Sequence, residues 1–423
     1  MVGSQPRENP TPAVSPLRSV EVIRALARPL VYVVEGKPLV SHMDFGMFCR
    51  DVHGKAVVVG AGFAGLNVAK ELSAQGVSVT LIDPKSYWDY TLASPRLAVG
   101  NAMSEDAAAY APALDKICEH LGVEFLQATV SSVVDGAVTL GDGIVIEAQA
   151  VVIAVGRAYA GGAAWKARAD ETTAEARKDG LARTAGEIAA AQSVVVAGAG
   201  LVGCEVAGEV RAKHPEKSVT LVGATAGGSA ELRRRTDQAL ADLGVTRVAG
   251  RCSRAASGAV TVEGGDDLPC DCYLDCTGTR HVAGALVKDA FPDAVAESGA
   301  IVAEATLLLK GAKNVFAVGE CLDVPAGRYV PPGGVAHAEA CAATVAANVA
   351  RVLSGEAPSV THNWSMSPVF VPCVQAFGPD RAAADFGGPA FLATAENFLG
   401  KKVKCGGFFM FKMGPDYGRG KTW

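Results

Sequence analysis

The clearest pattern of hydrophobic and polar positions lies between residues 53 and 83, where a short apolar run is followed by a glycine-rich turn. The run at residues 56–59 is short and rich in valine, which favours a buried β-strand over a helix. Leu66, Ala69 and Leu72 then lie three residues apart and predict a helix with one face on that strand. A second apolar run at residues 77–82 predicts another strand, so the stretch forms one βαβ unit.

The turn of this unit carries the spacing G-x-G-x-x-G at Gly60, Gly62 and Gly65. In a dinucleotide-binding turn, the first glycine permits the tight bend, the second lets the backbone approach a pyrophosphate, and the third lets helix and strand pack closely. The N–H groups at the helix start attract the negative charge. Asp83 follows the second strand, where a carboxylate can accept hydrogen bonds from an adenosine ribose. The pattern predicts a nucleotide site that fits NAD and FAD equally well.

The same pattern returns at residues 193–222, as a strand, a glycine turn, a helix and a strand. An internal repeat of a whole βαβ unit is far more specific than one glycine-rich loop. Two further buried strands end at Gly156 and Gly278, and each is expected to close one nucleotide domain. The repeated motif consists of Gly198, Gly200 and Gly203.

The remaining hydrophobic patterns predict the elements between and after these units. Apolar residues at helical spacing indicate helices, and short apolar runs or alternation bounded by turn residues indicate strands. The expected helical segments are residues 16–35, 107–120, 158–185 and 336–353. The expected strands are residues 123–127, 130–134, 138–140 and 144–146, a late strand that ends at Gly319-Glu320, and strand-like alternation within residues 365–423.

The chain length predicts two or three domains, because 423 residues exceed one ordinary domain. Hydrophobic residues make up 49% and charged residues 20%, as in a soluble globular protein with large cores. The expected fold class is α/β, with two Rossmann-like dinucleotide-binding domains and a small α+β C-terminal domain. The expected divisions are an extension at 1–53, a first nucleotide domain at 54–188 and 280–360, a second at 189–279, and a membrane-facing cap at 361–423.

Charge, apolar runs and cysteines exclude several classes of protein. A net charge of −5 argues against nucleic-acid binding, which needs a basic surface. No segment reaches the roughly 18 apolar residues of a membrane span. Eleven cysteines without a secretory signal fit a reducing compartment, the cytoplasm or an organelle matrix. The densest group, Cys270, Cys272 and Cys276, lacks a second cysteine pair, so no metal site is expected.

The first 53 residues leave two interpretations open. Arginines among apolar residues would suit a targeting segment, whereas Glu8 and Glu21 disfavour one, because transit peptides are poor in acids. The sequence does not decide whether this segment is removed. It also leaves the oligomeric state open.

Two dinucleotide units followed by a late strand ending in Gly319-Glu320 resemble the two-dinucleotide-binding-domain flavoproteins. In that family the first unit holds FAD and the second holds NAD(P)H. The segment HPEKSVTLVG at residues 214–223 and its surroundings are similar to the ferroptosis-suppressor-type, apoptosis-inducing-factor-like NAD(P)H:quinone oxidoreductases, which are related to type II NADH dehydrogenases. The resemblance covers roughly residues 54–423. It implies FAD as cofactor, NAD(P)H as co-substrate and a quinone as acceptor.

Matched residue by residue, the resemblance assigns roles around the FAD. Asp83 would bind the adenosine ribose, and Arg96 would lie by the cofactor unless it forms a surface salt bridge. Val130 would meet the adenine through its backbone, and Glu320 would bond the ribityl hydroxyls where the family usually has Asp. The residues expected at the FAD phosphates are Gly60, Ala61, Gly62, Phe63 and Ala64. The other expected cofactor residues are Gly65, Gly156, Gly198, Gly200, Gly203, Gly278 and Gly319.

In the second unit, the resemblance and the chemistry single out two positions. Glu205 lies two residues past Gly203, where related quinone reductases place a glutamate near nicotinamide and flavin. It is the candidate for a catalytic role, with helix N-terminal charge complementation as the alternative. Gly223 stands where an acid would bond the ribose 2′-OH of NAD. Without an acid at this position, a 2′-phosphate meets no negative charge here. The arginines at 233–235 could pair with that group or face solvent. We expect NADPH to be accepted, with NADH not excluded.

The missing cysteine pairs indicate how electrons leave the flavin. Disulfide reductases of this superfamily need C-x4-C after the first unit or C-x-x-C in the second domain, and this chain has neither. We therefore expect direct transfer from the flavin to a quinone or another small acceptor. Residues 400–423 carry six basic residues, one acid and several aromatic residues. This segment would suit an anionic membrane surface and peripheral contact with it, although a hairpin with buried phenylalanines is the alternative.

Two other functions remain open at this point. The same two domains serve reductases of small iron–sulfur redox proteins, and an acidic partner on the basic tail would favour that function. A redox-sensing interaction protein, as among apoptosis-inducing-factor relatives, would change its association upon cofactor reduction. His337 follows the expected helix start and could assist quinone protonation, or it could only cap or pack that helix.

Overall fold

The computed structural model describes residues 32–34, 37–39, 54–100, 110–159, 164–223, 230–326, 334–364, 373–378 and 381–385. The chain divides into two compact units, residues 1–50 and 51–423. In the first unit, β1 (Tyr32–Val34) and β2 (Lys37–Leu39) form an antiparallel pair. Within residues 16–35, the segment expected to contain a helix, residues 32–34 form a strand, because their aromatic and β-branched side chains favour one. The rest of that expected helix lies outside the described residues.

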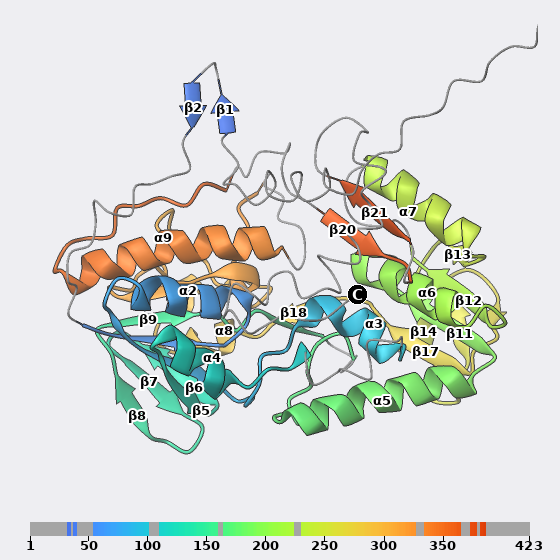
Figure 1. Ribbon diagram of the computed structural model, residues 1–423, viewed down its shortest axis with the longest axis horizontal. Helices are drawn as coiled ribbons and strands as arrows, with labels where there is room; N and C mark the ends of the chain where they lie inside the picture. The colour runs from blue at the N-terminus through green and yellow to red at the C-terminus, as the bar shows by residue number, and fades with distance from the viewer. Residues whose placement is uncertain are drawn as a thin grey trace, which may run out of the picture. The chain divides into compact units, whose positions relative to one another are not determined.

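A five-stranded parallel sheet of order β19-β9-β3-β4-β5 organises the first nucleotide unit (Figure 1). Helix α2 (Phe63–Ser73) packs on β4 and on α9 (Val335–Leu353). Because β19 comes from the late part of the chain and pairs with β9, the chain returns to this sheet after it has built the second one. The five strands are β3 (Lys55–Val59), β4 (Ser78–Asp83), β5 (Glu124–Gln127), β9 (Ala150–Ile153) and β19 (Val315–Ala317).

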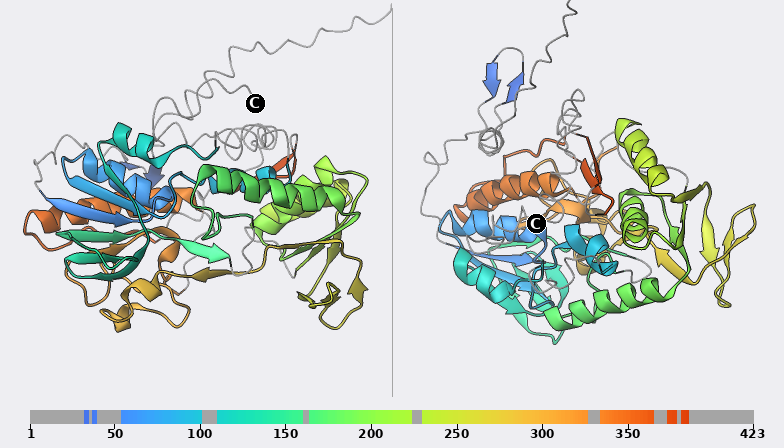
Figure 2. Two further views of the ribbon diagram at one scale, coloured as in Figure 1. Left: turned by 90° about the horizontal axis from the view of Figure 1, so that it is seen from below. Right: turned by 45° about the vertical axis from the view of Figure 1, so that its right-hand side comes forward.

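A second parallel sheet, of order β13-β12-β11-β17, carries the repeated motif. Helix α6 (Leu201–Lys213) packs on β12 and on α7 (Ala230–Asp242). The parallel strands are β11 (Ser193–Ala197), β12 (Ser218–Val222), β13 (Thr246–Val248) and β17 (Cys272–Asp275). Figure 2 shows an antiparallel sheet beyond the edge of this one, formed by β14 (Cys252–Arg254), β15 (Val260–Val262) and β16 (Asp267–Leu268).

Smaller elements surround and connect the two sheets. The predicted hairpin is present as β7 and β8, which pair antiparallel beside β6. Strands β10 and β18 pair antiparallel where the chain passes between the two parallel sheets. The remaining strands are β6 (Val130–Val134), β7 (Ala137–Leu140), β8 (Val145–Glu147), β10 (Arg157–Tyr159), β18 (Thr279–His281), β20 (Cys373–Ala376) and β21 (Ala382–Asp385). The remaining helices are α3 (Ser94–Ala98), α4 (Leu114–Leu121), α5 (Ala174–Ala190) and α8 (Gly284–Val287).

Two expected helices have different bounds. The helix expected over 107–120 begins only at Leu114, because Pro112 disfavours a helical conformation at residue 111 and Ala113 is extended in a bridge to Tyr87. Residues 101–109 lie outside the described part of the chain. Within the helical connection expected over 158–185, residues 157–159 form strand β10 instead. The helix there begins at Ala174, because the Thr173 hydroxyl accepts a hydrogen bond from Ala176 N at 3.2 Å and caps it.

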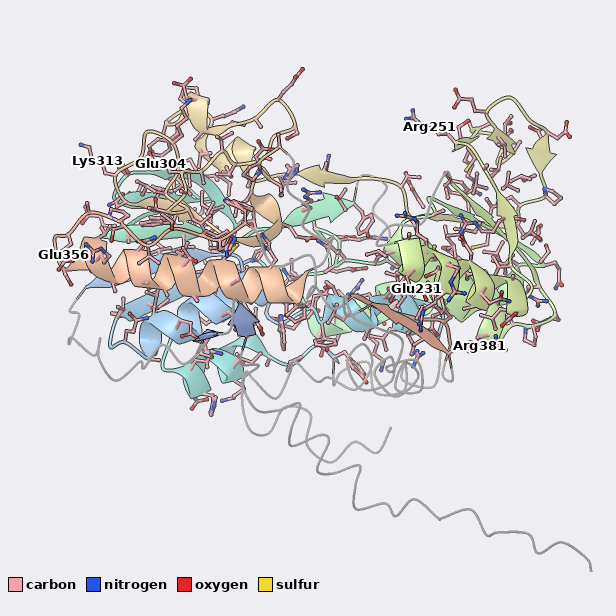
Figure 3. All side chains as sticks on the ribbon, turned by 90° about the horizontal axis from the view of Figure 1, so that it is seen from above. Glu231, Arg251, Glu304, Lys313, Glu356 and Arg381 are labelled. Atoms are coloured by element: carbon pink, nitrogen blue, oxygen red, sulfur yellow. The ribbon has the colours of Figure 1, made fainter. Side chains whose placement is uncertain are left out.

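The core follows from the apolar runs that predicted the strands. Val57 and Val58 of β3 and Val195 and Val196 of β11 are completely buried. Figure 3 labels charged side chains at the surface, and five of those labelled are exposed: Glu231, Arg251, Glu304, Lys313 and Arg381. The predicted α/β class with two Rossmann-like units is confirmed. The domain boundaries stay a prediction, since only β20 and β21 of the C-terminal part after residue 364 are described. None of the described helices is long and apolar enough to cross a membrane.

Candidate functional site

The first glycine turn connects β3 to α2 and has no room for side chains at two of its glycines. Gly60 has φ +103°, and a Cβ there would lie 2.7 Å from Ala154 O. A Cβ on Gly65 would lie 1.8 Å from Gly60 O, so the helix sits directly against the turn. Gly62, by contrast, has no atom within 4 Å of its built Cβ. The turn thus leaves backbone accessible at Gly62, as the approach of a pyrophosphate requires.

The second glycine turn, between β11 and α6, repeats this geometry. Gly198 has φ +97°, and its Cβ would lie 2.7 Å from Cys276 O. A Cβ on Gly203 would lie 1.8 Å from Gly198 O, while Gly200 is open. The two turns are therefore equivalent in structure. The assignment of FAD to the first turn and of NAD(P)H to the second stays a prediction.

Asp83, at the end of β4, braces the first turn. Its Oδ2 accepts a hydrogen bond from Ala61 N at 2.7 Å. Its Oδ1 accepts from the backbone N and the Nζ of Lys85, at 2.9 Å and 2.7 Å. The Asp83 side chain is only 5% exposed. The carboxylate is held at the turn by three donors, and its bond to a ribose stays a prediction.

A cavity of about 710 Å³ lies over the first turn, between the ends of the parallel strands and the first turn of α9. Clefts at this edge of an open α/β sheet are where nucleotides bind. Gly65 does not line the cavity, because it packs beneath the turn. The predicted glycines of the second nucleotide unit do not line it either. The predicted cofactor residues that line it are Gly60, Ala61, Gly62, Phe63, Ala64, Asp83, Val130, Gly156, Gly319 and Glu320.

The charged lining of the cavity suits a pyrophosphate. Cations outnumber acids five to three, and an excess of cations near accessible backbone N–H groups attracts phosphate oxygens. The residues present therefore fit FAD. The charged lining residues are Lys85, Arg157, Lys166, Arg168, Arg280, Asp83, Asp89 and Glu320.

Glu320 has protein partners that the sequence did not indicate. Lys166 Nζ lies 2.7 Å from Glu320 Oε2 and also donates to Arg157 O. Arg157 Nε donates to the Glu320 backbone carbonyl at 3.0 Å. The Lys166–Glu320 pair is about one-quarter exposed, so a ligand can reach it. Lys166 lies 154 residues from Glu320, and no local pattern marks it as a site residue.

Arg96 lies away from this cavity. It is buried on α3, and its guanidinium donates twice to Glu209 Oε1 on α6, at 2.7 Å and 3.0 Å. It also bonds the carbonyl of Gly378 in the turn between β20 and β21. Arg96 thus joins the two nucleotide units to each other through a buried ion pair rather than the surface pair considered above. Its assignment to the cofactor stays a prediction.

Glu205 is buried on α6, and its Oε1 accepts a hydrogen bond from Ala376 N of β20 at 3.2 Å. Tyr159 of β10 lines the cavity, and both Glu320 and Glu205 influence its ionisation. Burial raises the pKa of the Tyr159 phenol, and the charges of Cys276, Glu320 and Glu205 raise it further. The phenol keeps its proton near neutral pH and can donate a hydrogen bond. No local sequence pattern indicates Tyr159 as a site residue, and the nicotinamide role of Glu205 stays a prediction.

Gly223 follows β12 and is confined by the second turn. A Cβ on Gly223 would lie 2.4 Å from Ala199 N, so this backbone path leaves no room for an acidic side chain. Residues 224–229 lie outside the described chain. In α7, Arg234 and Arg235 both pair with Glu231 Oε1, at 2.8 Å and 2.7 Å. The acceptance of NADPH stays a prediction.

None of the eight cysteines whose side chains the structure describes lines the cavity, and all eight are free thiols. Cys321 directly follows Glu320 but is completely buried, and its Sγ bonds the carbonyls of Ile153 and Val318. Burial raises the pKa of this thiol to about 12, which removes the reactive thiolate at neutral pH.

Comparison with known proteins places this geometry in a family. The model of the family described as pyridine nucleotide-disulphide oxidoreductase matches residues 54–344. Ferroptosis suppressor protein 1 of Xenopus tropicalis is 26% identical over 310 residues, which cover 69% of this chain and 80% of that protein. Apoptosis-inducing factor homolog A of Dictyostelium discoideum is 30% identical over 178 residues, 42% of each chain. The sulfide:quinone oxidoreductase of Aquifex aeolicus has the same fold, with a TM-score of 0.63, 18% identity, and coverage of 85% of this chain and 91% of that one.

These matches confirm the resemblance to ferroptosis-suppressor-type and apoptosis-inducing-factor-like flavoproteins. They also confirm FAD as the cofactor with NAD(P)H as co-substrate. Two equivalent glycine turns and a cavity at the first of them are what such an enzyme needs. The chain therefore belongs to the pyridine nucleotide-disulphide oxidoreductase family, and it is an NAD(P)H-dependent flavoprotein oxidoreductase.

Proposed function

We propose that this enzyme passes electrons from NAD(P)H through FAD to a quinone at the surface of a membrane. The observation that carries the proposal is the absence of a described cysteine from the cavity wall, in a family named for disulphide chemistry. Without a thiol relay, electrons leave the cofactor directly for a diffusible acceptor. The sulfide:quinone oxidoreductase with the same fold supports the choice of acceptor, since the fold accommodates a quinone in that protein.

Bound FAD supplies the two-electron chemistry that links coenzyme and acceptor. In the proposed enzyme, the N–H groups of the first turn hold its phosphates and Asp83 its ribose. The Lys166–Glu320 pair would meet the ribityl hydroxyls, and Lys166 Nζ, which donates to Glu320 Oε2 at 2.7 Å, would hold that carboxylate in place. Tyr159, which lines the cavity, would serve there as a hydrogen-bond donor and not as an acid, because burial raises its pKa. Glu205 is proposed to lie beside the nicotinamide.

Peripheral membrane contact is the second part of the proposal. It rests on residues 400–423, which lie outside the described chain but carry six basic residues and one acid. Basic residues next to an anionic leaflet bind it by roughly 1 kcal/mol each. A lipid quinone could then be reached without a membrane-spanning helix.

The acceptor is tested by rapid mixing of the purified holoenzyme. NADPH or NADH is added without oxygen, and flavin reduction is followed by its absorbance. An oxidised short-chain quinone, an oxidised dye or an oxidised small ferredoxin is then mixed with the reduced enzyme. We expect reoxidation by the quinone on the timescale of turnover and slow reoxidation by the ferredoxin. Failure of every quinone in this step, with FAD bound and reduced, would sink the proposal, and fast electron transfer to the ferredoxin would favour the iron–sulfur alternative.

The membrane part is tested with vesicles that contain a long-chain quinone and either anionic or neutral lipids. The variant Lys401→Gln/Lys402→Gln/Lys404→Gln should lose activity on anionic vesicles and keep activity with the short-chain quinone. The matched control replaces three exposed lysines of the main unit, Lys288, Lys310 and Lys313, by Gln. Equal loss in both triple variants would mean that net charge, and not the tail, drives binding.

A further inference from the structure

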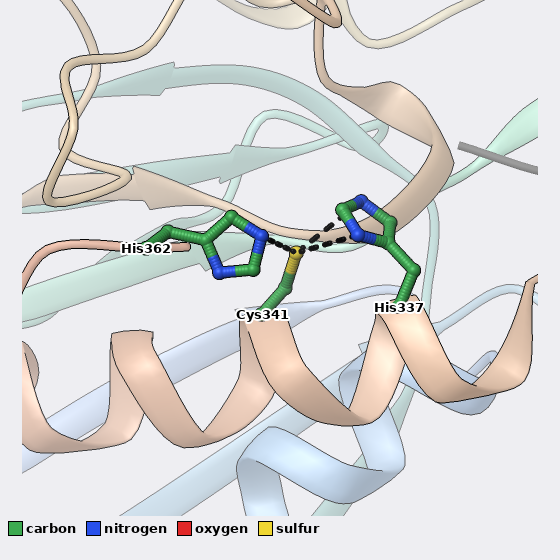
Figure 4. A group of neighbouring side chains, drawn as sticks. All are labelled: His337, Cys341 and His362. Carbon is green, nitrogen blue, oxygen red and sulfur yellow. Dashed lines mark hydrogen bonds between the residues drawn. The ribbon is translucent and has the colours of Figure 1, made fainter. Parts of the chain in front are cut away.

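A second cluster of reactive side chains lies beside the cavity and plays no part in the proposed reaction. His337 and Cys341 are four residues apart and project from one face of α9. His362, in the segment that follows α9, points at them from the opposite side (Figure 4). All three side chains are buried, at 3%, 0% and 6% relative exposure. Two imidazoles and a thiol therefore meet in a space that bulk water does not reach.

The distances within this cluster fit a tetrahedral zinc site. Cys341 Sγ lies 3.4 Å from His337 Nε2 and 3.6 Å from His362 Nε2. With Zn–S near 2.3 Å, Zn–N near 2.05 Å and tetrahedral angles, the sulfur and nitrogen ligands of one zinc ion lie about 3.6 Å apart. The three ligand atoms all lie within 4.8 Å of one another. A metal ion could bind without large movement of the backbone.

Neighbouring groups orient the His362 imidazole for this role. Thr344 Oγ1 donates to Ala340 O at 3.1 Å, which leaves its lone pair to accept from His362 Nδ1 at 3.4 Å. That bond places the His362 proton on Nδ1 and the free lone pair on Nε2, which faces Cys341. Metal-bound histidines are held in this way by a partner on the other ring nitrogen. Trp364 packs edge-on against the His362 ring, with centroids 4.9 Å apart, and limits its rotation.

We propose that His337 Nε2, Cys341 Sγ and His362 Nε2 bind one zinc ion, with a water molecule at the fourth position. Imidazole and thiolate together suit zinc, and three protein ligands leave one coordination position open. On binding, the Cys341 thiol loses its proton to solvent and the sulfur binds as thiolate. No oxidant or reductant is needed. The sequence predicted no metal site, because His362 lies 21 residues beyond Cys341 and local cysteine spacing does not reveal this group.

The proposed zinc would link α9 to the segment that follows it. His362 lies 21 residues beyond Cys341. The ion would therefore cross-link the two ends of a segment that contains the C-terminal half of α9 and the residues that follow it. His337 also lines the cofactor cavity, two residues beyond Val335 in the first turn of α9. Zinc would therefore fix a ring at the cavity wall while it stabilises the surrounding fold.

The test uses the full-length holoenzyme with FAD bound. The protein is stripped with a chelator, dialysed against a zinc salt, and analysed for zinc per FAD by mass spectrometry. We expect about one zinc per chain in the wild type and at least a tenfold weaker retention in Cys341→Ser and in His362→Asn. Cys321→Ser and His214→Asn are matched controls, since they change a buried cysteine and a histidine outside the cluster. Both should keep one zinc.

Two further measurements keep the proposal testable where a cluster variant folds poorly. Thr344→Val leaves all three ligands in place but removes the partner of His362 Nδ1, so zinc retention should fall about tenfold with FAD content unchanged. Zinc should also raise the melting temperature of the wild type and not that of Cys341→Ser. Anomalous scattering at the zinc edge would locate the ion in crystals. The proposal is overturned if the wild type binds no zinc, because the three groups would then only hydrogen-bond to one another. It is also overturned if Cys341→Ser and His362→Asn both retain zinc.

Discussion

The two glycine turns of this chain are nearly identical, but the residues that follow their second strands are not. In both turns, the built Cβ of the last glycine meets the carbonyl of the first at 1.8 Å. The N–H of the first glycine bonds the end of the second strand at 2.7 Å in each unit. The equivalent positions after those strands are Asp83 and Gly223. Asp83 bonds the turn, whereas Gly223 has no side chain and packs against Ala199.

This difference separates two tasks of the same motif. The turn itself is fixed by backbone packing, which is why three glycines recur with the same spacing. The residue at the end of the second strand differs between the units: Asp83 adds a side-chain bond to its turn, whereas the second turn forms beside Gly223 without one. We propose that this position faces the nucleotide. An acid there holds a ribose, and a glycine leaves the neighbouring space to whatever group the nucleotide carries.

The largest expected effect comes from filling the close contact in each turn. Gly65→Ala should lose FAD and lower the free energy of unfolding by more than about 4 kcal/mol, because its Cβ would overlap Gly60 O. Gly203→Ala makes the same clash at Gly198 O, but it should keep FAD and lose reduction by NAD(P)H. FAD per chain, urea unfolding and rapid-mixing reduction measure these outcomes.

The matched control for the two glycine variants is Gly186→Ala. Gly186 lies within α5, and no atom lies within 4 Å of its built Cβ. Alanine there should stabilise the protein by up to about 1 kcal/mol, through lower entropy of the unfolded chain. If Gly203→Ala released FAD as completely as Gly65→Ala, the division of labour between the two units would be wrong.

A smaller effect on stability is expected at the ion pair between Arg96 and Glu209, which joins the two nucleotide units. Arg96→Ala should cost about 3–5 kcal/mol of stability, because it leaves the Glu209 carboxylate buried without its cation. Arg96→Met/Glu209→Leu removes both charges and should recover most of that loss. Urea unfolding of the wild type, Arg96→Met, Glu209→Leu and the double variant measures the coupling.

The control for this pair is Lys116→Ala, which breaks an exposed ion pair with Glu119. It should leave stability nearly unchanged, because exposed pairs contribute little. A double variant no more stable than Arg96→Ala would show that the guanidinium acts mainly through its bond to the Gly378 carbonyl. In that case the contact to the C-terminal hairpin, and not the ion pair, would join the units.

Local patterns predicted the parts of the site that lie close together in sequence. Both βαβ units, their glycine turns and Asp83 follow from hydrophobic spacing and from the steric demands of glycine, which act within about 30 residues. The late strand that returns to the first sheet was predicted through the family resemblance. The sequence also showed that no cysteine pair stands where the disulfide reductases have one.

Contacts between distant residues could not be predicted in this way. Lys166 reaches Glu320 across 154 residues and Arg96 reaches Glu209 across 113, and neither lysine nor arginine carries a local signal of its partner. His362 meets Cys341 only because the chain turns back along α9. Composition also misplaced the start of α5, since an Ala-, Arg- and Glu-rich stretch does not show where a threonine will cap the helix.

The smallest expected effect concerns the coenzyme at the second unit, where Gly223 replaces the acid. Hydrogen bonds from Arg234 and Arg235 lower the pKa of Glu231 to about 2, so at neutral pH its carboxylate holds both arginines. Glu231→Gln removes one negative charge beside these arginines, so it should strengthen their attraction for a 2′-phosphate and raise the preference for NADPH over NADH by about two- to fivefold, the scale of one exposed ion pair. Steady-state kcat/KM with each coenzyme measures it. Glu304→Gln, at another exposed glutamate, is the control and should leave the ratio unchanged. A wild type that prefers NADH by a large factor would contradict the role given to Gly223, and an unchanged ratio in Glu231→Gln would place the arginines beyond reach of the coenzyme.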